Sequence, residues 1–202
     1  MLAVIDYGGG NLGSLIAALR RRGADFAIAG DPATLARADA AVLPGDGAFG
    51  ATMQALRDRA LDHAILQHVT GGKPFLGICV GMQILFEDSD EFGASAGLGI
   101  LQGHVSRFTA APRVPHMGWN NLDVCSSHPF VEDLGEEPYA YFLHSYRAPI
   151  GPDTVAACTH GERFAAVVAR GNVMGTQFHP EKSQRTGARL LDNFLALSGE
   201  ER

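Results

Sequence analysis

The sequence predicts one α/β domain with a central, mostly parallel sheet, helices on both faces and an extension of mixed strands. In the first ninety residues, short apolar runs alternate with segments of helical periodicity, a pattern typical of a parallel sheet wrapped by helices. The second half holds strand-like segments separated by turn residues, which indicates added strands of mixed direction. Because no repeat, low-complexity segment or linker interrupts the chain, we expect a single domain over residues 1–202.

The first half is expected to alternate regularly between strands and helices. The expected strands are 2–5, 24–29, 40–43 and 73–78, and the expected helices are 11–22, 51–69 and 81–86. The strands read as short buried runs, and the helix 11–22 carries its apolar residues on one face. Turn residues end these elements at Gly30-Asp31-Pro32, Pro44-Gly45 and Gly71-Gly72.

The second half is expected to add strands and one closing helix. The strand-like segments are 99–108, 121–124, 139–148, 154–159, 164–169 and 173–178. The last two are joined across Arg170-Gly171-Asn172, which predicts a hairpin turn. Residues 184–197 read as a helix whose leucines and Phe194 face the core.

Composition excludes several classes of protein. The 202 residues include 16 basic and 22 acidic side chains, for a formal net charge of -6, and 46% are hydrophobic. A chain of this kind buries a core rather than staying disordered, and its mild acidity argues against nucleic-acid binding. No apolar run approaches the roughly 18–20 residues of a membrane span, and the opening Met1–Asp6 lacks the basic region of a signal peptide. We therefore expect a cytoplasmic protein.

The cysteines predict neither a disulfide framework nor a zinc site. Cys79, Cys125 and Cys158 are an odd number, without a CxxC or Cys/His ligand spacing. We expect reduced thiols, no metal and no cofactor. Cys125 and Cys158 lie in strand-like contexts and read as surface or packing residues.

A glycine-rich segment near the start suggests a rival function. Gly8-Gly9-Gly10-Asn11-Leu12-Gly13 matches the dinucleotide-binding fingerprint between a strand and a helix, and Asp31 follows the second strand. The alternative is a tight turn that needs positive φ. Two residues separate the strand from the first glycine, and no later segment resembles a nicotinamide site. We favour the turn and keep a Rossmann-type oxidoreductase as the rival.

Cys79 has the context of a catalytic nucleophile. Gly77-Ile78-Cys79-Val80-Gly81 lies between a buried strand and a helix, which is the nucleophile elbow with Cys in place of Ser. The helix start presents unpaired N–H groups and the positive end of its dipole to the thiol. This matters because a free cysteine is only about 3% thiolate at pH 7. The alternative is a buried core cysteine, but the flanking glycines favour the nucleophile.

His179 is the best candidate for the base. It ends the apolar strand 173–178 and is followed by Pro180-Glu181. In an extended chain, residues two apart project to the same side, so the carboxylate of Glu181 could hold the imidazole tautomer. Pro180 is expected to keep the segment non-helical. The alternative is a surface turn with incidental charges.

An oxyanion hole needs two hydrogen-bond donors. The N–H of Val80 follows the nucleophile and is the first candidate. The glycine-rich loop 44–50 follows the third strand and is expected at the same edge of the sheet, where it could supply the second N–H; an ordinary flexible turn is the alternative. The residues alone thus indicate cysteine-based acyl transfer or amide hydrolysis.

Together these motifs resemble the class I, triad-type glutamine amidotransferases. The resemblance is carried by Pro44-Gly45-Asp46-Gly47, the elbow 77–83 and Phe178-His179-Pro180-Glu181. It implies a flavodoxin-like fold. In the implied reaction, Cys79 attacks the side-chain amide of glutamine, His179 acts as base and Glu181 orients His179. Ammonia then leaves, and water hydrolyses the glutamyl thioester. The implied oxyanion and glutamine contacts are Gly45, Asp46, Gly47, Val80, Gln83, His144, Ser145 and Tyr146.

Four further segments of the sequence are similar to segments of the glutaminase subunits of imidazole glycerol phosphate synthase. They are the opening 6–12, Gly81-Met82-Gln83, the segment 115–120 and His144-Ser145-Tyr146. The similarity implies a heterodimer with a (β/α)8-barrel cyclase, which receives ammonia through a channel. The cyclase makes imidazole glycerol phosphate and the aminoimidazole carboxamide ribonucleotide in histidine biosynthesis.

Three residues are candidates for the partner interface. Trp119 stands in a Met-Gly-Trp-Asn-Asn segment that reads as a turn, where a tryptophan suits an interface anchor, although a core position is equally compatible. Lys182 follows the proposed triad acid, with ordinary solvation as the alternative, and Asn11 lies in the glycine loop. A stand-alone or differently partnered glutaminase and a Cys hydrolase of esters or peptides remain the alternatives.

Overall fold

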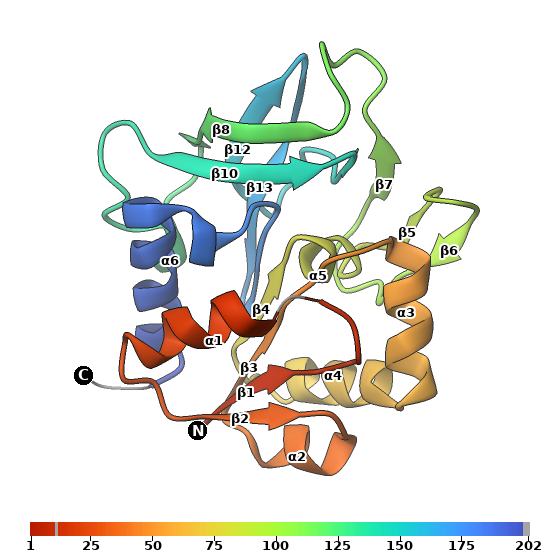
Figure 1. Cartoon of the computed structure of the whole chain (residues 1–202), viewed down its shortest axis with the longest axis vertical. Helices are drawn as coiled ribbons and strands as arrows, with labels where there is room; N and C mark the ends of the chain where they lie inside the picture. The colour runs from red at the N-terminus through yellow and green to blue at the C-terminus, as the bar shows by residue number, and fades with distance from the viewer. Residues whose placement is uncertain (11, 200–202) are drawn as a thin grey trace.

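The centre of the molecule is an eight-stranded mixed sheet (Figure 1), in a computed structural model that describes residues 1–10 and 12–199. Its strand order is β2-β1-β3-β4-β14-β13-β12-β9. In chain order the strands are β1 (Leu2–Ile5), β2 (Phe26–Ala29), β3 (Ala40–Leu43), β4 (Phe75–Ile78), β9 (Asp123–Val124), β12 (Thr154–His160), β13 (Glu162–Arg170) and β14 (Val173–Thr176). β1 to β4 and β14 are parallel, whereas β13, β12 and β9 pair antiparallel. The predicted mixed α/β sheet and the hairpin between β13 and β14 are confirmed.

Helices cover both faces of this sheet. α1 (Leu12–Arg20) and α6 (Gln184–Leu197) pack on one face, and α2 (Pro32–Arg37), α3 (Phe49–Asp58) and α4 (Leu61–Thr70) pack on the other (Figure 1). Alternate residues of one strand serve the two cores: Leu2 and Val4 pack with α1 and α6, and Ala3 and Ile5 with α2 to α4. Burial on both faces explains why the parallel strands read as continuous apolar runs.

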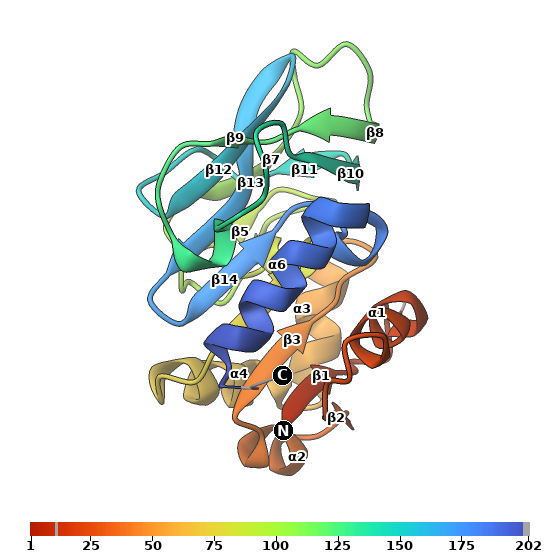
Figure 2. The same ribbon diagram turned by 90° about the vertical axis from the view of Figure 1, so that its left-hand side faces the viewer.

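The short helix α5 (Val80–Gln83) follows β4. Two smaller sheets lie beyond the parallel strands. One pairs β8 (His116–Asn121) with β10 (Tyr139–His144). The other has the order β11-β7-β5-β6, made of β5 (Asp88–Ser89), β6 (Ser95–Ala96), β7 (His104–Arg107) and β11 (Tyr146–Arg147). Figure 2 shows β7, β8, β10 and β11 above β1 and β3. The remaining elements are two 3-10 turns, η1 (Pro129–Val131) and η2 (Pro180–Lys182).

The prediction of one long helix over 51–69 was wrong. The chain forms α3 and α4 instead, with Ala60 between them in the left-handed region at φ 55°. No glycine or proline marks the break. A tertiary contact accompanies it: the side chain of Arg59 donates from Nε to the carbonyl oxygen of Tyr7 at 2.9 Å.

Other boundaries also differ from the expectation. α2 was not predicted, although Asp31 is an N-cap that accepts from the N–H of Thr34 at 2.9 Å, and Pro32 fits the first helical turn. The helix expected over 81–86 is only α5, and the strand expected over 99–108 is only β7. Residues 116–121 form a strand rather than a turn because they pair along their whole length with β10.

Within the described ranges, the structure has no helix that is both long and apolar enough to cross a membrane.

Candidate active site

Cys79 occupies a strained turn between β4 and α5. Its backbone has φ 55° and ψ -114°, a conformation that side-chain-bearing residues rarely adopt. The Cys79 N–H donates to the carbonyl oxygen of Thr176 at 2.7 Å, which ties the turn to β14. The helical hydrogen bonds of α5 begin with the N–H of Met82 on the Cys79 carbonyl at 3.0 Å, so the N–H of Val80 precedes the helix's bonded amides. The geometry is that of a nucleophile elbow.

Glycines allow the elbow to approach its neighbours closely. A Cβ on Gly77 would lie 2.3 Å from the carbonyl oxygen of Gly81, and one on Gly81 would lie 2.3 Å from that of Leu43. A Cβ on Gly45 would lie 2.3 Å from Val80 Cγ1 and 2.5 Å from the Gly81 nitrogen. The loop that follows β3 therefore packs directly on the elbow, where its backbone can serve the same site.

His179 and Glu181 come from the end of β14. The imidazole donates from Nδ1 to Oε1 of Glu181 at 3.0 Å, and both side chains are buried. The expectation of a non-helical segment was wrong, because η2 forms a 3-10 turn. Proline is compatible with the first position of such a turn, where its missing N–H is not needed.

Several hydrogen bonds hold this turn in place. The hydroxyl of Ser183 donates to the carbonyl oxygen of His179 at 2.7 Å, and the N–H of Lys182 donates to the same oxygen at 3.0 Å. Ser183 Oγ also accepts from the N–H of Tyr141 in β10 at 3.0 Å. The position of the imidazole is thus coupled to the β8–β10 pair.

The electrostatics of the site favour a protonated imidazole. Burial by itself lowers the pKa of His179, but hydrogen bonds with Cys79 and Glu181 outweigh it and raise that pKa to about 10. At neutral pH, the imidazole of His179 is therefore protonated, and it lies between the sulfur of Cys79 and the carboxylate of Glu181. A second carboxylate lies on the other side of the ring, with Asp46 Oδ1 3.7 Å from Nε2.

A cavity of about 290 Å³ opens onto the sulfur. Among the predicted contact residues, Gly45 is the one that does not line it; it lies one residue before the wall. The lining residues are Asp46, Gly47, Cys79, Val80, Gln83, Glu91, Pro115, Leu143, His144, Ser145 and Tyr146. The volume suits a small polar metabolite.

Glu91 is a pocket residue that the sequence did not reveal. It follows β5 in a segment without a recognisable motif, and its carboxylate accepts from the N–H of Phe49 at 2.7 Å. Burial raises the pKa of this carboxyl group, and the nearby Asp90 adds to the effect. Only the packing of the segment after β5 against the start of α3 brings this acid to the pocket.

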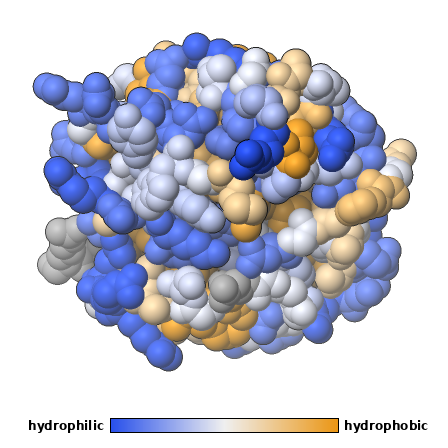
Figure 3. All heavy atoms as spheres, turned by 45° about the horizontal axis from the view of Figure 1, so that its top comes forward, coloured by the Kyte–Doolittle hydropathy of each residue, from blue (hydrophilic) through white to orange (hydrophobic). Residues whose placement is uncertain are grey.

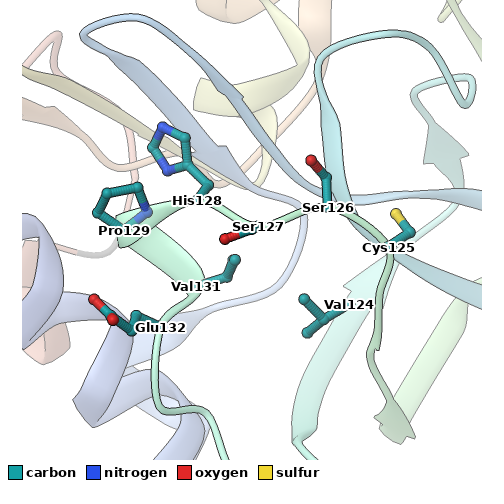
Figure 4. Close-up of a pocket in the computed structure, with 8 residues that line it drawn as sticks. All are labelled: Val124, Cys125, Ser126, Ser127, His128, Pro129, Val131 and Glu132. Atoms are coloured by element: carbon teal, nitrogen blue, oxygen red, sulfur yellow. The ribbon is translucent and has the colours of Figure 1, made fainter.

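The other two cysteines lie elsewhere. Cys158 is buried in the core, and burial raises its pKa to about 12. Cys125 is exposed at a larger hollow of about 540 Å³, which is lined by residues 124–129, 131 and 132 (Figure 4). The imidazole of this hollow, His128, accepts from the N–H of Phe130 at 3.1 Å and so caps η1. Of the three thiols, the one at the elbow is thus the one with a buried base and acid.

Gly8 and Gly9 of the glycine-rich segment near the start pack closely against neighbouring side chains. A Cβ on Gly9 would lie 2.7 Å from the ring of Tyr7, and the Asp31 carboxylate is engaged as the cap of α2. Among the described residues, no group of three or more His, Cys, Asp and Glu side chains is arranged to hold a metal ion.

The structure gives the positions of two of the three predicted interface residues. Trp119 lies on β8 with 49% of its surface exposed, and Lys182 is half-buried at the end of η2. Asn11 lies outside the described residues.

Comparison with known proteins identifies the family. The sequence model of the family "Glutamine amidotransferase class-I" matches residues 3–197. The chain is 47% identical to the imidazole glycerol phosphate synthase subunit HisH of Salinibacter ruber, with 98% of this chain and 94% of the relative covered. It is 49% identical to the HisH subunit of a Synechococcus species, with 96% and 92% covered. The chain belongs to the HisH family of class-I glutamine amidotransferases.

Solved structures of more distant proteins show the same fold. A crystal structure of a glutamine amidotransferase superposes with a TM-score of 0.78 at 22% identity, covering 98% of this chain and 99% of the other. The structure of PurLQS from Thermotoga maritima gives 0.76 at 23% identity, covering 97% of each chain. The family predicted from the motifs is confirmed, and the dinucleotide interpretation is not supported.

Proposed function

We propose that this HisH-family chain hydrolyses glutamine to glutamate and ammonia through Cys79, His179 and Glu181, acting as one glutaminase domain. The observation that carries the proposal is the elbow cysteine opening onto a pocket beside an imidazole that donates to a buried carboxylate at 3.0 Å. This is the arrangement of nucleophile, base and orienting acid that acyl transfer requires.

The reaction follows from the positions of these groups. The sulfur of Cys79 attacks the carboxamide carbon of glutamine, while the imidazole of His179 holds the proton. The negative oxygen that develops faces the N–H of Val80 and the backbone of the loop 45–47. His179 then gives its proton to the leaving ammonia, and a thioester remains. In the second half, His179 takes a proton from the water that attacks the thioester, and glutamate is released.

Glutamine recognition is expected to use the acidic wall of the pocket. Gln83 donates both of its amide hydrogens inside the protein, to the Tyr146 carbonyl at 2.9 Å and to Gln177 Oε1 at 3.0 Å. Its amide oxygen is thus the atom left to accept a hydrogen bond from a ligand. With Glu91 and Asp46 on the same wall, it favours the α-ammonium group of an amino acid.

We infer that the outer face of β8 and β10 is where the partner docks. Apolar side chains alternate outward along both strands, and in the space-filling view exposed apolar residues interrupt a mostly hydrophilic surface (Figure 3). The exposed side chains are Met117, Trp119, Tyr139 and Leu143. Trp119 packs edge-on against Tyr141 at 5.9 Å between ring centroids. Such a patch is typical of a protein interface.

The proposed occupant is a (β/α)8-barrel cyclase, by analogy with the synthase named for the HisH relatives. Leu143 belongs both to the patch and to the pocket wall, so a partner docked here would cover the mouth of the active site. Ammonia released there could pass to the cyclase before it equilibrates with water. Lys182, beside the triad, is proposed to make a charged contact with that partner.

Glutamate release is the direct test. We expect turnover by the wild-type chain to rise strongly when the barrel cyclase and its nucleotide substrate are added, and to be lost in Cys79→Ser in every mixture. Equal turnover with and without the cyclase would keep the glutaminase and refute the partner. Absence of Cys79-dependent turnover in all mixtures would refute the proposed function.

Replacing Trp119 with alanine tests the docking face. We expect the affinity for the cyclase to fall about 10- to 100-fold, because a large aromatic anchor at an interface carries much of the binding energy. Titration calorimetry or a pull-down at graded concentrations measures the effect. Ile150→Ala removes an exposed apolar side chain outside β8 and β10 and should leave binding unchanged; equal losses in both variants would contradict the assignment.

A further inference from the structure

Gln177 is a fully buried amide in contact with the nucleophile. It follows β14, is 0% exposed, and its backbone N–H donates to the Ala166 carbonyl at 2.8 Å. Its side chain donates from Nε2 to Cys79 Sγ at 3.8 Å, and its Oε1 accepts from Gln83 Nε2 at 3.0 Å. No step of the proposed reaction uses this side chain.

The orientation of the Gln177 amide is determined by its neighbour. If the amide were turned over, its NH2 group would face the NH2 group of Gln83, and two donors would oppose each other. Gln83 cannot turn either, because its second hydrogen is held by the Tyr146 carbonyl at 2.9 Å. The NH2 group of Gln177 therefore has to point at the sulfur.

The carbonyl of Tyr146 also accepts a second hydrogen bond, which extends the network toward the β8–β10 pair. His144 donates from Nδ1 to the Tyr146 carbonyl at 2.8 Å, so its Nε2 is an acceptor, and His116 Nδ1 lies 3.1 Å from it as the donor. Asn120 then donates to His116 Nε2 at 3.2 Å. Burial lowers the pKa of His116 to about 4 and that of His144 to about 3, so both rings are neutral and the direction of every bond is defined.

We propose that Gln177 stabilises the charged sulfur of Cys79 with a hydrogen bond. The series of hydrogen bonds from His116 through His144 and Gln83 holds the Gln177 amide in the donating orientation. A donor aimed at the charged form of a group favours that form. Gln83, His144 and His116 are positioning residues in this arrangement. The role of the charged sulfur in turnover rests on the proposed glutaminase function, whereas the hydrogen bond itself needs no glutamine.

Other charged groups act on the same sulfur. His179 shares a hydrogen bond with it, the carboxylates of Asp46 and Glu91 lie on the pocket wall, and Tyr7 is close enough for the sulfur's charge to affect its hydroxyl. All of them remain in a Gln177 variant. A change in sulfur reactivity in such a variant therefore reports the missing donor.

The test is the pH dependence of alkylation by iodoacetamide in the full-length chain. A Cys125→Ser background removes the exposed second thiol. Gln177→Met keeps a similar volume without the donor, and we expect the pH of half-maximal alkylation to rise by about one unit, with a rate about tenfold lower near pH 6. Gln177→Glu places an acceptor at the sulfur and should shift the profile further. His116→Phe, which keeps a ring among the surrounding aromatic side chains, should give a smaller shift in the same direction.

Thr154→Val is the matched control. Thr154 is a buried residue at the start of β12, and its hydroxyl accepts from the N–H of Gly151 at 3.0 Å. The variant loses this hydrogen bond, which lies away from the sulfur, so its alkylation profile should match that of the wild type. A Gln177→Met profile that coincides with the control would overturn the proposal. If the Gln177 variants do not fold, an unchanged profile in His116→Phe would overturn it instead. If the variants show the expected shifts but the wild-type chain releases no glutamate with its cyclase, only the glutaminase function is contradicted.

Discussion

Glutamate release is expected to fall by at least about 10³-fold when His179 is replaced by asparagine. Without the imidazole, no group remains to hold a proton between the sulfur of Cys79 and the leaving ammonia. The carboxylate of Glu181, which accepts from Nδ1 at 3.0 Å, would lose that partner while buried. The effect should appear in kcat more than in KM, because the ring acts on the transition state rather than on bound glutamine.

Alkylation of Cys79 provides the second readout for this variant. We expect the alkylation rate near neutral pH to fall, because the imidazolium no longer stabilises the charged sulfur. His63→Asn is the matched control, since the His63 side chain is 83% exposed on α4. Loss of activity without any change in alkylation would show that His179 acts only on the leaving group.

Gly187→Ala is expected to damage both the fold and the site. The new Cβ would lie 1.9 Å from the Pro180 carbonyl oxygen and 2.6 Å from its carbon, and both are backbone atoms that cannot turn away. α6 or η2 must therefore move, and η2 carries Glu181. We expect a loss of roughly 2–4 kcal/mol in the free energy of unfolding. Turnover should fall about 10²-fold, because a small displacement of a catalytic group is enough for such a loss.

Urea unfolding and steady-state kinetics measure the two effects separately. Gly151→Ala is the control, since its Cβ would meet no atom within 4 Å, and both stability and turnover should be close to the wild type. Full activity in Gly187→Ala with lowered stability would mean that α6 moves while the triad stays in place. Wild-type stability would contradict the close packing of α6 on η2.

The candidate nucleophile and base could be proposed from the sequence because each follows a local pattern. Cys79 lies between glycines at a strand–helix junction, and His179 and Glu181 lie two residues apart at the end of an apolar strand. The structure brings both strands together, because β4 and β14 pair in parallel with Ile78 opposite Thr176. A parallel register places the two carboxyl ends at one edge of the sheet, so the residues just beyond them meet.

The hydrogen-bond network behind the sulfur was not readable in the same way. Gln83 was singled out as a contact to glutamine, yet its hydrogens serve Tyr146 and Gln177. Glu91 and Gln177 gave no motif at all. Their roles depend on which neighbour each amide or carboxylate meets, and these neighbours lie 42 and 94 residues apart in the two contacts that define them.

By itself, the sequence determined the sheet with its helices, the elbow and the contact between His179 and Glu181, because apolar periodicity, glycine spacing and a proline act over a few residues. Only the tertiary structure decided the break between α3 and α4 at Ala60, the strand that carries Trp119, and the approach of Glu91 to the pocket. Each of these depends on a partner distant in the chain. The energy of a left-handed residue, a half-exposed tryptophan or a half-buried carboxylate depends on the residues that pack against it, and adjacent residues do not encode those contacts.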